Sequence, residues 1–251
     1  MKCIIMGSAT TPYAHGAFVY DIYFDDNYPD GPPKINLSTT GGGAIRFNPN
    51  LYNCGKVCLS LLGTWRGTAT ENWNPKVSTL LQVILSIQAI IMSNEVYFNE
   101  PGYEHLMGTD EGEKLNNGYA NIVRYGTLKY AIVEQLKNPT AGFEDIIRRN
   151  FFLKKDMILT EVDGWIERDK SEAANYTDGL TTSHNPDIAA MLGESDKAYR
   201  NKMIELRKEL VIEFAKLDSP YQDVTNTSSA TPPPEKNQDL EVKEESKEST
   251  S

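Results

Sequence analysis

The sequence is poor in cysteine, in long apolar segments and in clustered basic residues. Three cysteines in 251 residues do not make a disulfide framework. Cys54 and Cys58 are four residues apart, and no second Cys or His pair lies nearby to complete a zinc site. The most apolar run, Leu80–Met92, is interrupted by polar residues and is shorter than the ~20 residues needed to cross a bilayer. These absences exclude a disulfide scaffold, a structural zinc module and a membrane-spanning protein.

The net charge is −10, and an acidic chain without a basic stripe is a poor match to the phosphate backbone of nucleic acids. Half of that charge lies in residues 218–251, which are rich in Pro, Ser, Thr, Glu and Lys and predict a disordered acidic tail. The first 13 residues contain one Lys and a very short apolar stretch, which is not typical of a signal peptide. We therefore expect a reduced, intracellular protein in the cytoplasm or nucleus.

The first part of the chain predicts strands. Lys2–Met6 is apolar and β-branched, and Ala17–Phe24 alternates between apolar and polar positions, as a half-buried strand does. Lys34–Thr39 predicts a further strand, and a run of three glycines leads into a fourth apolar stretch, Ala44–Phe47. Residues 48–76 predict little regular structure, but their tryptophans and leucines indicate that the segment is packed down.

The rest of the chain predicts helices. Apolar residues recur at steps of three and four, with Ser78 as a candidate N-cap of the first helix, and the expected helices span 77–93, 119–136, 143–152, 156–168 and 187–217. The last helix carries an apolar stripe of Met203, Leu206, Leu210 and Phe214, which is too short for a coiled coil. We expect this stripe to bind a partner or to dimerise. Strands followed by helices predict an α+β fold, with an antiparallel meander sheet covered by helices.

Cys58 is the candidate nucleophile, because a thiolate on a partly exposed loop is intrinsically reactive. Cys54 has the same chemistry but sits at the tip of a turn, and the alternative for either residue is a buried, inert cysteine. A cysteine hydrolase would also need an imidazole base. The histidines are His15, His105 and His184, and His105 is the one expected to approach Cys58.

Five motifs follow one another along roughly residues 7–133. They are Thr11–Phe24, Tyr28–Lys34, Asn48-Pro49-Asn50 with Cys58 eight residues after Asn50, Trp73-Asn74-Pro75 and Thr127–Ala131. In order and spacing these motifs resemble the ubiquitin-conjugating enzyme family. The stretch RFNPNLYNCGKVCLSLLGTW with YFNEPGYE downstream is similar to the giant, apollon/BRUCE-type conjugating enzymes, followed by the large hybrid conjugating/ligase enzymes.

The resemblance implies a mechanism. The Cys58 thiolate would accept ubiquitin from the activating enzyme as a thioester, and a lysine amine would then attack that thioester. Asn50 matches the family's asparagine and would stabilise the oxyanion or support its loop. Glu100 would help to deprotonate the lysine, with Glu104 as a competitor for this role. His105 needs no role in such a scheme.

The resemblance also implies the partners, which are ubiquitin, the activating enzyme and either a ligase or a self-contained ligase activity. No cofactor and no metal would be bound, since ATP is used by the activating enzyme, and neither nucleic acid nor membrane would be a partner. A catalytically inactive module of the same fold, binding ubiquitin or another partner, is the alternative function.

Three departures from the family pattern modify these expectations. Asn48 replaces the usual histidine, and we expect the loop to tolerate it. Asp30 stands where a Phe that touches RING-type ligases is common and Lys76 where a small residue is common, so ordinary RING docking is not expected. The family's first helix and first strand should precede Lys2, so we expect an N-terminally truncated conjugating core.

The expected organisation therefore has five parts. They are a conjugating core at 1–133, a helical extension at 134–170, a linker at 171–186, a long helix at 187–217 and the disordered acidic tail at 218–251.

Overall fold

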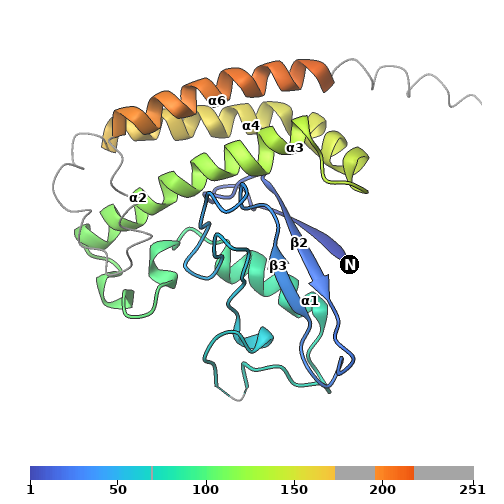
Figure 1. The fold of residues 1–251 in the computed structure, drawn as a ribbon. Helices are drawn as coiled ribbons and strands as arrows, with labels where there is room; N and C mark the ends of the chain where they lie inside the picture. The colour runs from blue at the N-terminus through green and yellow to red at the C-terminus, as the bar shows by residue number, and fades with distance from the viewer. Residues whose placement is uncertain (69, 173–195, 218–251) are drawn as a thin grey trace, which may run out of the picture. The chain divides into compact units, whose positions relative to one another are not determined.

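The computed structural model describes residues 1–68, 70–172 and 196–217 (Figure 1). The predicted tail at 218–251 lies outside the described residues. So does the predicted linker, except for residues 171–172, which continue a helix. None of the described helices is both long enough and apolar enough to span a membrane.

Three strands form an antiparallel meander, as predicted. β1 (Lys2–Met6) pairs with β2 (Ala17–Tyr23), and β2 pairs with β3 (Lys34–Leu37). The prediction of a strand at Ala44–Phe47 is wrong. The three preceding glycines all have positive φ values, between 62° and 93°, so the chain turns there instead of extending.

The strand β2 is buried on both of its faces. On one face Phe18 and Tyr20 lie beside Ile5 and Cys3 of β1 and join the core beneath α1. On the other face Ala17 joins a second apolar cluster that is built mainly from the C-terminal helices. From Ala17 to Tyr20 neither face of the sheet is exposed, because each face is covered by a different set of helices.

The first helix begins and ends close to the predicted limits. α1 (Leu80–Ser86) continues through a π-helical turn, η2 (Ile87–Ile91). Its N-cap is Thr79 rather than Ser78. Thr79 accepts a hydrogen bond from the backbone of Gln82, whose side chain in turn accepts one from the Thr79 backbone, a reciprocal capping box.

The second helix starts earlier than predicted. α2 (Asp110–Gly126) passes without a break into η5 (Thr127–Val133) and α3 (Glu134–Lys137), and short 3₁₀ turns lie at η1 (Ser60–Leu62), η3 (Tyr97–Asn99) and η4 (Glu104–Leu106). The polar stretch before residue 119 is helical because Thr109 caps it and three acidic residues occupy its first turn, where the helix dipole favours negative charge.

The prediction of two shorter helices at 143–152 and 156–168 is wrong, because α4 (Glu144–Glu172) is continuous. No Pro or Gly interrupts the residues between the two predicted segments, and one buried stripe runs through both. It consists of Ile147, Phe151, Ile158, Val162 and Trp165.

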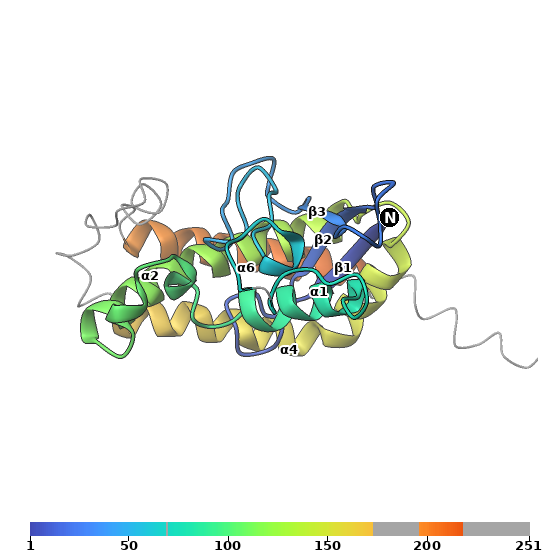
Figure 2. The same ribbon diagram turned by 90° about the horizontal axis from the view of Figure 1, so that it is seen from below.

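The last described helix is α6 (Asp196–Leu217), and residues 187–195 of the predicted helix lie outside the described residues. α6 runs beside α4 (Figure 1, Figure 2), and a bidentate Arg207–Asp163 pair joins them. The predicted stripe is real, with Met203, Leu210 and Phe214 buried. It packs against the chain's own helices, so it is not a free dimerising face.

Asn48 connects three parts of this fold. Its side chain is fully buried, and its Nδ2 donates to the carbonyl oxygen of Ile91 (2.9 Å) and to the Tyr13 hydroxyl (3.2 Å). Its Oδ1 accepts from the backbone N–H of Asn50 (2.9 Å). The end of the first helix, the loop before β2 and the segment that leads to Cys58 are therefore held by one amide.

We predict that Asn48→Ala destabilises the protein by about 2–4 kcal/mol, since each buried polar group left without a partner costs about 1–3 kcal/mol. The measurement is the free energy of unfolding in urea, followed by circular dichroism. Asn53→Ala, at an exposed turn position, is the matched control and should change stability by no more than about 0.5 kcal/mol. Equal stability of the two variants would contradict this role of Asn48.

Candidate active site

Asn50 and Cys58 face each other across a tight β-hairpin. The Cys58 N–H donates to the Asn50 carbonyl (2.9 Å), Leu51 pairs with Val57, and the Tyr52 N–H donates to the Lys56 carbonyl (3.0 Å). Gly55 closes the turn at φ 90°, where a Cβ atom would lie 2.5 Å from the Asn36 side chain. The eight-residue spacing between Asn50 and Cys58 is therefore the spacing of two residues paired in register.

The two faces of this hairpin differ in chemistry. Leu51 and Val57 are buried in the main core and anchor the hairpin. Because neighbouring strand residues point to opposite faces, Asn50, Tyr52 and Cys58 share the other one. Tyr52 is the side chain on this face that interacts with the Cys58 thiol and favours its thiolate form, lowering the thiol pKa.

Cys58 is more buried than the sequence predicted, since only 2% of the residue is exposed. Burial raises the pKa of its thiol above the ordinary value. Three groups act in the opposite direction, in decreasing order of effect: the positive charge of Lys56, the hydrogen bond from Tyr52 and the positive charge of Arg46. The site thus holds a mainly protonated thiol at neutral pH, together with groups that stabilise the thiolate when it forms.

The side-chain oxygen of Asn50 has no hydrogen-bond partner among the described residues. The backbone of Asn50 is fully engaged, because the N–H donates to Asn48 and the carbonyl accepts from Cys58. Its side-chain Oδ1 is buried, and no group among the described residues hydrogen-bonds to it. A buried polar atom without a partner is uncommon, so Oδ1 is free to accept a hydrogen bond from a donor outside this chain.

The structure distinguishes the two candidate acids. Glu100 follows the η3 turn, and its Oε2 lies 3.6 Å from Nη2 of Arg46. Glu104 instead accepts a hydrogen bond from the Gly102 N–H (2.8 Å) within its own turn. Glu100 is therefore the acid that is connected to the hairpin.

The histidines give no support to a cysteine hydrolase. His105 is bonded to the Gly102 carbonyl through Nδ1 (2.7 Å), and no histidine is among the groups that shift the Cys58 pKa. His184 lies outside the described residues. Among the described residues, neither His15 nor His105 is placed to act as the base that hydrolase chemistry of that type requires.

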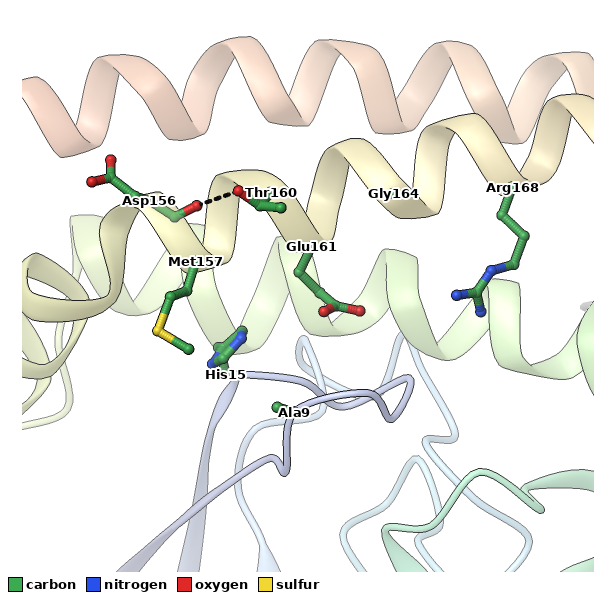
Figure 3. A pocket seen from close by; sticks show the side chains of 8 residues that line it. All are labelled: Ala9, His15, Asp156, Met157, Thr160, Glu161, Gly164 and Arg168. Atoms are coloured by element: carbon green, nitrogen blue, oxygen red, sulfur yellow. Dashed lines mark hydrogen bonds between the residues drawn. The ribbon is translucent and has the colours of Figure 1, made fainter.

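His15 lies buried under α4, where it lines a cavity of about 520 Å³ (Figure 3). Burial lowers the pKa of His15, the charge of Lys154 lowers it further, and Glu161 opposes both. Cys58 is not among the residues that line this cavity, which are Ala9, His15, Asp156, Met157, Thr160, Glu161, Gly164 and Arg168.

Asp30 and Lys76, the two residues that depart from the family pattern at the predicted ligase surface, are both exposed. Their segments meet through Trp73, whose indole N–H donates to the Pro29 carbonyl (2.8 Å). The aromatic ring of Tyr28 lies 5.9 Å from that of Trp73. An exposed carboxylate therefore stands where the family commonly presents an aromatic ring.

Sequence analysis missed two residues of this site, Arg46 and Tyr52. The alternation Asn50-x-Tyr52 on the hairpin was a signal for Tyr52, because it puts the ring on the face of the cysteine. No sequence signal indicated that Arg46 is buried. Among the described residues, no group of three or more His, Cys, Asp or Glu side chains could hold a metal ion.

Comparison with known proteins identifies the family. Residues 1–123 match the family model described as "Ubiquitin-conjugating enzyme". The "Dual E2 ubiquitin-conjugating enzyme/E3 ubiquitin-protein ligase BIRC6" of Homo sapiens is 44% identical over 206 residues, which are 82% of this chain and 4% of the relative. The "Probable ubiquitin-conjugating enzyme protein 17" of Caenorhabditis elegans is 41% identical over 221 residues, 88% of this chain and 29% of the relative.

A third relative, from Acanthamoeba polyphaga mimivirus, is named "Probable ubiquitin-conjugating enzyme E2 R521". It is 46% identical over 181 residues, 70% of this chain and 13% of the relative. The chain thus spans less than a third of each of these three proteins. All three matches are longer than the family model's, so the similarity continues beyond residue 123 into the C-terminal helices. The chain belongs to the ubiquitin-conjugating enzyme family.

Proposed function

We propose that this chain is a ubiquitin-conjugating transferase that carries ubiquitin as a thioester on Cys58 and passes it to a lysine amine. One observation carries the proposal: in a chain of this family, Asn50 and Cys58 are paired across a hairpin. Acyl transfer requires a nucleophile and a polar donor, which the Cys58 thiol and the Asn50 amide N–H would supply. The Glu100 carboxylate is joined to the segment before the hairpin through Arg46.

The first step is a transthioesterification. The Cys58 thiolate attacks the carbonyl carbon of the thioester between ubiquitin and the activating enzyme, forming a new carbon–sulfur bond. The bond to the activating enzyme's sulfur breaks, and that sulfur leaves as a thiolate. The reaction conserves the thioester, so it needs no cofactor here, and ATP is consumed earlier by the activating enzyme.

The second step is aminolysis. A neutral lysine amine attacks the Cys58 thioester, the nitrogen loses a proton, and the Cys58 thiolate leaves as the amide forms. Asn50 stabilises the oxyanion or supports the loop that holds it. Glu100 attracts the ammonium form of the lysine and helps to remove its proton.

The partners of the proposed reaction are ubiquitin, the activating enzyme and a lysine acceptor, in the cytoplasm or nucleus. One relative is described as a dual E2/E3 enzyme, which supports a self-contained ligase activity in the longer protein of that kind. The exposed carboxylate of Asp30 favours that arrangement over docking of a separate RING ligase through an aromatic contact at this position.

A second candidate function is a non-catalytic module of the same fold that binds ubiquitin. The observation that favours it is the burial of Cys58, which leaves 2% of the residue exposed and raises the thiol pKa. In that case the protein would bind ubiquitin and form no adduct.

We predict a reducible ubiquitin adduct when the protein is incubated with activating enzyme, ATP and ubiquitin. Cys58→Ala should abolish the adduct completely, while Cys54→Ala should leave it intact, because Cys54 is an exposed residue at the hairpin tip. The measurement is gel mobility with and without thiol reductant. An adduct that persists in Cys58→Ala would refute the site, and ubiquitin binding without any adduct would favour the non-catalytic module.

We also predict slow alkylation of Cys58 at pH 7. Its raised pKa leaves little thiolate at that pH, so its rate should increase about tenfold per pH unit until the raised pKa is reached. Peptide mass spectrometry after iodoacetamide treatment would separate it from the exposed Cys54, which serves as the internal control. A rate for Cys58 that is already at its maximum at pH 7 would contradict the prediction.

A further inference from the structure

Arg46 is a buried cation outside the groups assigned to the reaction. Only 4% of the residue is exposed, and it lies two residues before Asn48, in the segment that enters the hairpin. A buried charge is costly unless it is paired and hydrogen-bonded, so the partners of Arg46 indicate why it is there.

The guanidinium contacts three segments of the site. Nη2 donates to the Pro49 carbonyl (2.7 Å), the residue directly before Asn50. The same nitrogen lies 3.6 Å from the Glu100 carboxylate. The guanidinium carbon lies 4.1 Å from the ring centroid of Tyr52, which shares the hairpin face of Cys58.

Each of these contacts is made with a residue that neighbours or carries a group of the proposed reaction. Through Pro49 the arginine fixes the backbone that carries Asn50. Through Tyr52 it fixes the ring on the Cys58 face of the hairpin, and through Glu100 it joins the acid loop to the segment that enters the hairpin. The backbone of Arg46 is itself held, because its carbonyl accepts from the Tyr119 hydroxyl (3.1 Å) on α2.

The contact with Glu100 leaves room for a substrate. It is a single contact at 3.6 Å, longer than a hydrogen bond and not the two-pronged pairing that arginine can make with a carboxylate. Among the described residues, Arg46 is the only cation within ion-pair distance of Glu100. The carboxylate can therefore keep this contact and still accept from an incoming lysine ammonium.

We propose that Arg46 is a positioning residue that holds the Glu100 carboxylate and the Tyr52 ring in register with Cys58, so that the acceptor lysine is received beside the thioester. This inference rests on the proposed function. A neutral or flexible side chain in place of Arg46 could not hold both groups, because only a planar guanidinium stacks on a ring and pairs with a carboxylate at the same time.

The test compares Arg46→Gln, Arg46→Lys, Glu100→Gln and the double variant Arg46→Gln/Glu100→Gln in the full chain. Arg207→Gln is the matched control, since it removes an arginine–carboxylate pair that joins α4 and α6. Each variant is charged with ubiquitin, and the discharge of the thioester to free lysine is followed between pH 6.5 and 9.5.

We expect Arg46→Gln and Glu100→Gln each to slow discharge by about 10-fold to 100-fold at neutral pH, with smaller losses as the lysine deprotonates at higher pH. The double variant should be no slower than the slower single variant, because both act through one carboxylate. Arg46→Lys keeps the charge and should be intermediate. If Arg46 only stabilises the fold, the pH profile of discharge stays unchanged or the two losses multiply, and either result overturns the inference.

A second measurement needs no ubiquitin. Because the charge of Arg46 lowers the Cys58 pKa, Arg46→Gln should move the alkylation profile of Cys58 to higher pH, whereas Arg207→Gln should not. An unchanged profile overturns the inference. Absence of an adduct in the unmodified protein would overturn the proposed function instead, and the alkylation profile would still decide whether Arg46 acts on Cys58.

Discussion

A single buried amide holds together the parts from which the site is built. Asn48 has no contact with solvent, and its two donated bonds and one accepted bond reach the end of the first helix, the Tyr13 loop and the backbone of Asn50. In a low-dielectric interior such a network is stabilising only when every member is satisfied. The register of the hairpin that presents Cys58 therefore depends on this one side chain.

The two faces of the hairpin have different roles, because neighbouring residues of a strand point to opposite sides. On one face, Leu51 and Val57 are apolar and fix the hairpin to the core. The opposite face carries the thiol, the amide and the tyrosine. Burial suppresses the thiolate, and nearby positive charge with a hydrogen bond favours it. In the proposed reaction Cys58 would both attack a thioester and leave from one, and this balance would suit it because a nucleophile and a leaving group place opposing demands on the thiol pKa.

Much of the fold could be predicted from the sequence. The strand β2 alternates clearly between apolar and polar positions, and the family resemblance pointed to Cys58 and Asn50, which the structure pairs across a hairpin. The failures have specific causes. The start of α2 was missed because its first turn is stabilised by capping and charge rather than by apolar periodicity. The continuity of α4 was missed because three consecutive charged residues, Lys154, Lys155 and Asp156, interrupt the apolar periodicity without interrupting the helix.

The candidate site was predicted less completely, since burial and partner choice depend on residues far apart in the chain. Arg46 and Glu100 are 54 positions apart, and a surface salt bridge and a buried one cannot be distinguished in a sequence. The sequence favoured Glu100 and left Glu104 as a competitor. The structure separates them, because Glu104 accepts from Gly102 within its own turn while Glu100 contacts Arg46.

Because both faces of β2 are buried, the end of the family match does not coincide with the end of the apolar core that covers the sheet. A polypeptide ending at residue 123 would stop inside α2 and remove every helix that covers Ala17 and its neighbours on that side of the sheet. It would then expose an apolar surface that is covered in the longer chain. The region matched by the family model and the C-terminal helices thus share one apolar cluster, so an experiment that isolates the matched region should retain the helices that follow it.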